Sequence, residues 1–284
     1  PLDSNSIIVT CTAIATIDPD DAAIRVLATD TIVKEGSGGT ALAHTFTLTR
    51  GEYLDSAVTV DWQLVGTGGN PVNATDFGGT LPSGSITFAA GETNKTLTIT
   101  PTPDAQFEPH EGYEIVLTTS QSGVVLEVDH AGGIVLNDDA GLTLVATNLD
   151  VAEGNPGSAS QLTFTVQRTG DTTSVSTVDW SLIPASTDGV VADDFGSGGL
   201  PSGSLTFARG VSSMLVTIPL SNDVIIEPDK GFSIQLSNPS VGTELLVSEV
   251  GGVIRNDDAA FEVQAAAPVG EGHGGTAISF NVVR

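Results

Sequence analysis

Apolar and polar residues alternate along much of this chain of 284 residues. In the stretch SAVTVDWQL, the residues Val58, Val60, Trp62 and Leu64 occupy alternate positions with polar residues between them. A period of two places successive side chains on opposite faces of a β-strand, whereas a helix repeats about every 3.6 residues. The stretches SGSITFAA, TNKTLTIT, GYEIVLTT and GGIVLNDD alternate in the same way, and Gly, Pro and Asn clusters separate them. We therefore predict short antiparallel strands and no strongly helical segment.

The chain contains an internal repeat. The pentapeptide VDWQL returns as VDWSL, so that Trp62 and Trp180 lie 118 residues apart. Asp138 and Asp257, in the recurring NDD motif, lie 119 residues apart, which indicates a shift of one residue within the repeat. A period of this length is typical of a whole domain and too long for one unit of a solenoid.

We predict two full repeats, 23–139 and 140–258, with partial repeats on either side. Residues 1–22 match the last strand of a preceding repeat, and 259–284 match the first two strands of a further one. About seven short strands per repeat, each with one apolar face, indicate two sheets packed face to face. The predicted fold class is all-β: tandem immunoglobulin-like antiparallel β-sandwiches. Because the terminal strands lack the rest of their sheets, we expect them to fray or to pair with a neighbouring chain.

The charge balance restricts the partners. The chain has 35 acidic and 9 basic residues, which gives a formal net charge of −26. Binding to phosphate backbones needs clustered Lys and Arg, so nucleic acid is excluded as a partner. No apolar run is long enough to span a bilayer, so we predict no membrane insertion. The single cysteine, Cys11, excludes a disulfide scaffold. The acidic balance favours cations as ligands.

Most of the prominent acids lie at strand ends and in loops. Alternate strand ends of a sandwich meet at the same pole, so we expect these carboxylates to converge there. Calcium takes roughly six to eight oxygen ligands from carboxylates and carbonyls, whereas zinc and copper need His or Cys clusters, which this sequence lacks. In the first repeat the acids are Glu35, Asp76, Asp104, Glu108, Glu111, Asp138 and Asp139.

The order of the motifs VKEG, VDW, DFG, GSITF, DAQFEPHEGY and IVLNDD resembles the Calx-beta domain family. The resemblance covers almost the whole chain, as two full copies and two partial ones. This family includes the calcium-sensing domains of sodium/calcium exchangers, one domain of an integrin, and repeats of large bacterial surface proteins. The resemblance implies that Ca²⁺ is bound at the ends of the strands.

The resemblance also implies a set of calcium ligands, position by position. In the first repeat these are Glu35, Asp76, Asp104, the main-chain carbonyl of Gln106, Glu108, Glu111, Asp138 and Asp139. In the second repeat they are Glu153, Asp194, Asp223, the carbonyl of Ile225, Glu227, Asp257 and Asp258. Two positions depart from the family pattern, since Pro103 and Asn137 replace acids. We therefore expect fewer ions than in the best calcium-binding members.

The second repeat has Lys230 where the first has Glu111. An ammonium group can replace a cation electrostatically, so we expect Lys230 to fill one calcium position. The second repeat should then bind fewer ions, or bind them more weakly.

Other motifs carry no function here. The DFG triplets at 76–78 and 194–196 lack the glycine-rich loop, strand Lys and HRD segment of a kinase. His44 is in phase with Phe46, which predicts a core or strand-end position, and we expect His110 to be a solvated loop residue. No Ser or Cys has a base in a recognisable pattern, so we predict that the protein is not an enzyme.

These observations favour a calcium-binding structural and adhesion array in a large extracellular or cell-surface protein, with a bacterial source expected. Asp139 is followed at once by the next strand, so a calcium ion there would stiffen the junction between repeats. The expected partners are calcium ions, neighbouring repeats of the same chain, and a protein or glycan adhesion target. One alternative is a cytosolic calcium-sensing regulatory region of a membrane transporter. Another is a metal-free carbohydrate-binding module, against which the core phase of Trp62 and Trp180 counts.

Overall fold

The computed structural model describes residues 20–37, 39, 41–196, 198–265, 268, 270 and 277–284. Within these residues the regular elements are strands and two short 3-10 turns, η1 (Thr75–Phe77) and η2 (Ala192–Phe195). None of the described segments forms a helix with the length and apolarity needed to cross a membrane. The strand expected within 1–22 lies almost entirely outside the described residues.

The chain divides into two compact units, each built around its own sandwich. The first contains the residues up to Glu35 together with 41–102 and 109–136. The second contains everything from Asn137 onward and also two loops, 36–40 and 103–108, that precede it in the sequence.

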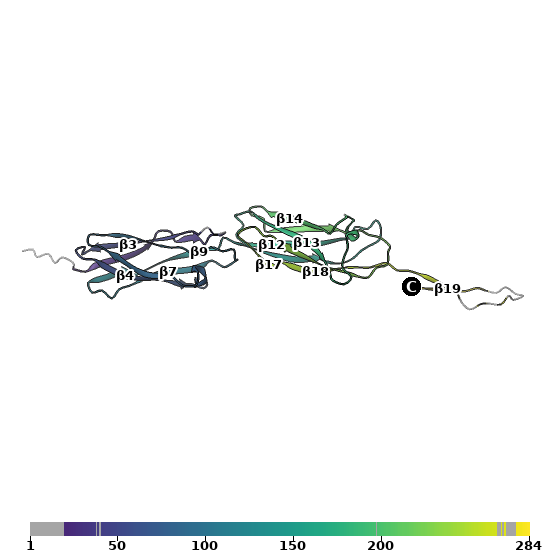
Figure 1. Cartoon of the computed structure of the whole chain (residues 1–284), viewed down its shortest axis with the longest axis horizontal. Helices are drawn as coiled ribbons and strands as arrows, with labels where there is room; N and C mark the ends of the chain where they lie inside the picture. The colour runs from purple at the N-terminus through teal and green to yellow at the C-terminus, as the bar shows by residue number, and fades with distance from the viewer. Residues whose placement is uncertain are drawn as a thin grey trace, which may run out of the picture. The chain divides into compact units, whose positions relative to one another are not determined.

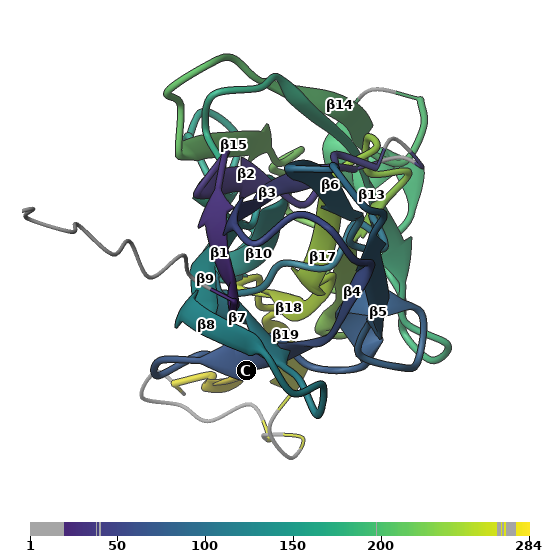
Figure 2. The same cartoon turned by 90° about the vertical axis from the view of Figure 1, so that its left-hand side faces the viewer.

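The first sandwich contains nine strands (Figures 1 and 2): β1 (Ala22–Ala28), β2 (Ile32–Lys34), β3 (His44–Glu52), β4 (Val58–Thr67), β5 (Ser83–Phe88), β6 (Asn94–Ile99), β7 (Glu111–Thr118), β8 (Val124–Val128) and β9 (His130–Leu136). One sheet has the order β6-β3-β1-β8 and the other the order β2-β9-β7-β4-β5. The prediction of an all-β sandwich is confirmed, although the number of strands is larger than the expected seven. One reason is that the first strand is split: β1 pairs in parallel with β8, and β2 crosses to pair with β9 in the opposite sheet.

The apolar face of each strand forms the core between the two sheets. In β4, Val58, Val60 and Leu64 are each at most 2% exposed, as their alternation predicts. The hydroxyl of Thr59, on the opposite face of β4, lies 2.9 Å from the hydroxyl of Thr87 on β5. Trp62 is only half-buried. The period of two therefore determines which side chains are shielded from water.

The second sandwich repeats this arrangement with β10 (Ala140–Asn148), β11 (Asp150–Ala152), β12 (Gln161–Gly170), β13 (Ser176–Pro184), β14 (Ser202–Phe207), β15 (Ser213–Pro219), β16 (Lys230–Ser237), β17 (Thr243–Val247) and β18 (Glu249–Arg255). Its sheets have the orders β15-β12-β10-β17 and β11-β18-β16-β13-β14. Two further strands, β19 (Glu262–Ala265) and β20 (Phe280–Val283), pair antiparallel with each other. Each of these two strands thus has a partner within its own chain.

The core of the first sandwich contains a polar pair that the second lacks. His44 is fully buried, and its Nδ1 lies 2.5 Å from the hydroxyl of Tyr113, with the two rings edge-on. Nε2 of His44 has no hydrogen-bond partner among the described residues. Burial lowers the pKa of His44, more than nearby Asp30 raises it, and burial raises the pKa of Tyr113 to about 12. At the matching positions the second sandwich has Leu162 and Phe232.

This difference predicts an acid-sensitive first sandwich. Below about pH 6.5 this histidine is protonated in the unfolded chain, whereas the buried His44 of the folded chain stays neutral because its pKa is lowered. The unfolded state then binds more protons, so the free energy of unfolding falls as the pH decreases. We expect the double variant His44→Leu, Tyr113→Phe, which copies the second repeat, to lose about 1 kcal/mol less stability than the wild type between about pH 7.5 and 5.5. Denaturant unfolding of both proteins at the two pH values measures this. An equal loss in both would contradict it.

Candidate metal centres

Asp139 carries a fully buried carboxylate. Its side chain is 0% exposed, and neither carboxylate oxygen has a hydrogen-bond partner among the described residues. Burial, and after it the neighbouring carboxylates of Asp138 and Asp104, together raise the pKa of Asp139 to about 7. A buried carboxylate in this state is costly unless a cation or a proton neutralises it.

Two further acids approach Asp139. Carboxylate oxygens of Glu35, Asp104 and Asp139 all lie within 4.8 Å of one another. Glu35 follows β2 and is 4% exposed, and its main-chain N–H donates to the carbonyl of Leu136 at 2.9 Å. Asp104 is exposed, and its Oδ1 accepts a hydrogen bond from the N–H of Gln106 at 2.7 Å. Oxygens that share a calcium ion at about 2.3–2.6 Å have separations within this range.

A second triad consists of Asp76, Glu108 and Glu111, whose oxygens also lie within 4.8 Å of one another. Asp76 is buried in the turn η1, where its Oδ2 accepts a hydrogen bond from the N–H of Asn73 at 2.6 Å. Glu111 begins β7, and both glutamates are half-buried. The tertiary fold thus brings six of the eight predicted positions of the first repeat into two clusters suited to a hard cation.

The remaining predicted positions of the first repeat have other contacts. Oδ1 of Asp138 accepts a hydrogen bond from the N–H of Gly36 at 3.0 Å, and Asp138 belongs to neither triad. Gln106 is exposed, and its side-chain amide donates to Glu108 at 2.7 Å. The coordination of an ion by the carbonyl of Gln106 stays a prediction.

Asn137 has a structural role that the sequence analysis missed. Its Oδ1 accepts a hydrogen bond from the N–H of Glu108 at 3.2 Å, and its Nδ2 donates to the carbonyl of Asp139 at 2.8 Å. An ionised aspartate has no donor and could not make the second bond. The signal was available, because Asn256 recurs at the same place and bonds Glu227 and Asp258 at 3.2 and 3.1 Å.

In the second repeat an ammonium group stands where the first has a carboxylate triad. Lys230 begins β16 as Glu111 begins β7, and its Nζ forms salt bridges with Asp194 and Glu227. The side chains of Lys230 and Asp194 are only 11% and 9% exposed. Although burial lowers the pKa of Lys230, its hydrogen bonds to the two carboxylates raise it overall. The cluster is thus neutralised largely from within the chain.

The other acids of the second repeat differ in their surroundings. Glu153 is 6% exposed, and burial, followed by Asp223 and Glu227, raises its pKa to about 7, while Lys230 lowers it. Oδ2 of Asp258 is buried without a hydrogen-bond partner among the described residues. Oδ1 of Asp257 accepts a hydrogen bond from Gly154 at 3.1 Å. In the part of this repeat that the structure describes, no three acids approach as closely as the two triads of the first. Ile225 is 59% exposed, and its role as a carbonyl ligand stays a prediction.

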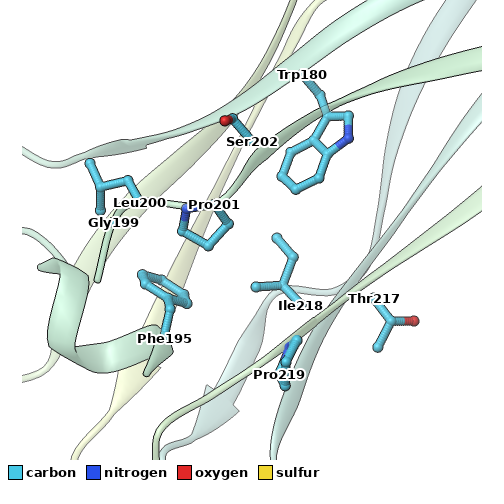
Figure 3. Close-up of a pocket in the computed structure, with 9 residues that line it drawn as sticks. All are labelled: Trp180, Phe195, Gly199, Leu200, Pro201, Ser202, Thr217, Ile218 and Pro219. Atoms are coloured by element: carbon cyan, nitrogen blue, oxygen red, sulfur yellow. The ribbon is translucent and has the colours of Figure 1, made fainter. Parts of the chain in front are cut away.

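A pocket in the second sandwich bears on the carbohydrate-binding alternative (Figure 3). It has a volume of about 400 Å³, and its lining includes the apolar side chains of Trp180, Phe195, Pro201 and Ile218. Trp180 is only 9% exposed, and its indole packs edge-on against Phe164 with 5.2 Å between ring centroids. A sugar-binding platform needs an accessible aromatic face, and Trp180 does not present one.

Comparisons with known proteins bear on the family and the fold. The family model of the Calx-beta domain matches residues 18–140 and 136–259. Adhesion G-protein coupled receptor V1 of Danio rerio is 28% identical over 193 residues, which is 64% of this chain but 3% of the receptor. The calcium binding domain CBD12 of CALX1.1 is 17% identical, with 81% of this chain and 99% of that chain covered and a TM-score of 0.37. The apo-form Calx CBD1 domain is 26% identical over 41% of this chain and 98% of its own, with a TM-score of 0.34.

Proposed function

Because this chain belongs to the Calx-beta family, we propose that it is a non-catalytic, calcium-binding structural array. In this proposal the first repeat holds calcium at two carboxylate triads, Glu35–Asp104–Asp139 and Asp76–Glu108–Glu111. The observation that carries the proposal is the carboxylate of Asp139, which is fully buried and without a hydrogen-bond partner among the described residues. Among the described residues, the charged groups that act on this carboxylate are other carboxylates, and a shared cation would offset their repulsion.

In the second repeat we propose a weaker or smaller site. The ammonium of Lys230 already neutralises Asp194 and Glu227, so a second positive charge there would be repelled. The acids left for calcium are Glu153, Asp223, Asp257 and Asp258. Lys230 also acts on one of these acids, since it lowers the pKa of Glu153.

We further propose that calcium stiffens the connection between repeats. Asp139 is the last residue before β10, which begins at Ala140 without a linker. An ion that fixes the carboxylate of Asp139 also fixes the main chain that leads into the next strand. Without the ion, mutual repulsion among Asp138, Asp139 and Asp104 favours a looser segment.

The setting we propose is a large extracellular or cell-surface protein in which such repeats act as spacers and adhesion modules. The similarity to an adhesion receptor of Danio rerio supports this setting. A cytosolic sensing region of a membrane transporter is the competing proposal. The two differ in affinity, since extracellular modules bind calcium at about 10⁻⁴–10⁻³ M and cytosolic sensors at about 10⁻⁷–10⁻⁵ M.

Calorimetric melting of the chelator-stripped protein tests calcium binding directly. We expect about 1 mM calcium to raise the melting temperature of the first repeat, because an ion that binds only the folded state stabilises it by mass action. Magnesium at the same concentration controls for screening of the net charge of −26. Equal small shifts with both ions would contradict specific binding, and isothermal titration would then show no saturable calcium site.

A further inference from the structure

A contact made by the acidic loop of the first repeat suggests a docking surface on the second. Phe107 lies in the loop 103–108, which belongs to the second unit. A Cβ on Gly170, whose φ is +79°, would stand 2.5 Å from the main-chain carbonyl of Asp139 and 2.6 and 2.7 Å from ring carbons of Phe107, so a side chain at this position would clash with both. The N–H of Phe107 donates to Oε2 of Glu244 at 2.8 Å. Gly170 and Glu244 are here called the Phe107 seat.

The loop 223–227 of the second repeat is built on the same hydrogen bonds as the loop 104–108. Asp104 accepts from the N–H of Gln106 at 2.7 Å, and Asp223 accepts from the N–H of Ile225 at 2.7 Å. The last residue of each loop donates to the asparagine of its NDD motif, at 3.2 Å in both cases. Ile226 therefore has the place in its loop that Phe107 has in the first.

This second loop presents an apolar tip. Val224, Ile225 and Ile226 are 65%, 59% and 53% exposed. Three consecutive exposed apolar side chains are unusual on a soluble surface and are typical of an interaction site.

We propose that Val224, Ile225 and Ile226 dock on a following β-sandwich of the same family, which offers a seat like that of Phe107. The chain after the tip supports this partner, because Asp257-Asp258-Ala259-Ala260 repeats the pattern Asp138-Asp139-Ala140-Gly141 at the start of the second repeat. A sandwich beginning at Ala259 would thus be joined to the tip as the second repeat is joined to Phe107. The partner needs a glycine at the position of Gly170 and an acceptor at that of Glu244.

The first repeat does not provide such a seat. In the strand pairing, Glu52 stands opposite Ala22 as Gly170 stands opposite Ala140. Val125 likewise stands at the position of Glu244. A glutamate side chain would occupy the space of the docked residue, and valine offers no acceptor. The first repeat is therefore a matched control for the second as a docking partner.

Hydrogen exchange in extended chains tests the proposal. One extended chain carries a second copy of 140–258 after Asp258, the other carries a copy of 22–139 there, and both are compared with the original chain in chelator. We expect the amide of Ile226 to exchange at least about tenfold more slowly when 140–258 follows, and to keep its original rate when 22–139 follows. The amide of Phe107 in the same molecules is the internal reference for a docked loop.

Three results would overturn the proposal. The first is an unchanged rate at Ile226 in the chain extended by 140–258, while the amide of Phe107 is protected. The second is equal protection by both extensions, which would show that the seat is not what the tip recognises. The third is protection that survives Ile226→Asp in that chain. Because chelator is present throughout, absence of calcium binding would leave this outcome untouched.

Discussion

Replacing Asp139 with asparagine is expected to stabilise the calcium-free protein and to remove most of the stabilisation that calcium provides. The neutral amide relieves the repulsion that Asp138 and Asp104 exert on the buried carboxylate. It can also donate hydrogen bonds to Glu35 or Asp104, whose oxygens lie within 4.8 Å of those of Asp139. The amide, however, removes one negative charge from the site, and calcium affinity depends on the number of charged ligands.

The two effects have opposite signs, which makes the variant informative. In chelator at about pH 8 we expect Asp139→Asn to gain about 1–3 kcal/mol, the usual cost of an unsatisfied buried polar group. At a calcium concentration about 100 times the dissociation constant, the wild type should gain about 2.7 kcal/mol that the variant lacks. Denaturant unfolding with and without calcium measures both quantities.

Asp258→Asn is the matched control, because Asp258 has the same place in the second NDD motif but is only half-buried. Asp258→Asn should change the stability in chelator and the stabilisation by calcium less than Asp139→Asn does. If Asp139→Asn destabilised the calcium-free protein, the carboxylate would have a stabilising partner and the proposed site would be wrong.

Replacing Lys230 is expected to produce the second large effect. Lys230→Met leaves Asp194 and Glu227 in a largely buried site without their cation. Removing one partner of a buried ion pair typically costs about 3–5 kcal/mol. Lys230→Glu should lose at least as much stability in chelator. However, it gives the second repeat three carboxylates in the places that Asp76, Glu108 and Glu111 occupy in the first. Calcium should therefore restore Lys230→Glu and leave Lys230→Met destabilised.

The reciprocal variant is Glu111→Lys, which places an ammonium in the first triad. We expect it to lower the number of calcium ions bound per chain while leaving the first repeat folded without calcium. Calorimetric melting of the three variants in chelator and in calcium measures their stability, and isothermal titration measures the number of ions that each binds. A wild-type melting temperature for Lys230→Met would show that the ion pair is worth no more than a surface one, about 0–1 kcal/mol.

The sequence by itself determined the fold class, because the signal for it is local. The alternation in Val58, Val60 and Leu64 specifies a strand and its buried face without reference to any other part of the chain. The recurrence of the pattern after 118 residues, as from Trp62 to Trp180, likewise needs no coordinates. The substitution of Lys230 for Glu111 was visible as soon as the repeats were aligned.

Only the tertiary structure decided which acids are buried without a hydrogen bond and which accept one. Asp138 and Asp139 are adjacent and look equivalent, yet one accepts a hydrogen bond from Gly36 and the other is buried without any partner among the described residues. The difference arises because strand pairing brings residues about a hundred positions apart into contact. The role of Asn137 also depends on the tertiary structure, because its amide can donate a hydrogen bond only if the carbonyl of Asp139 lies within reach. Composition and spacing predict which residues reach a pole of the sandwich, but burial and hydrogen bonding there depend on distant segments that no local pattern encodes.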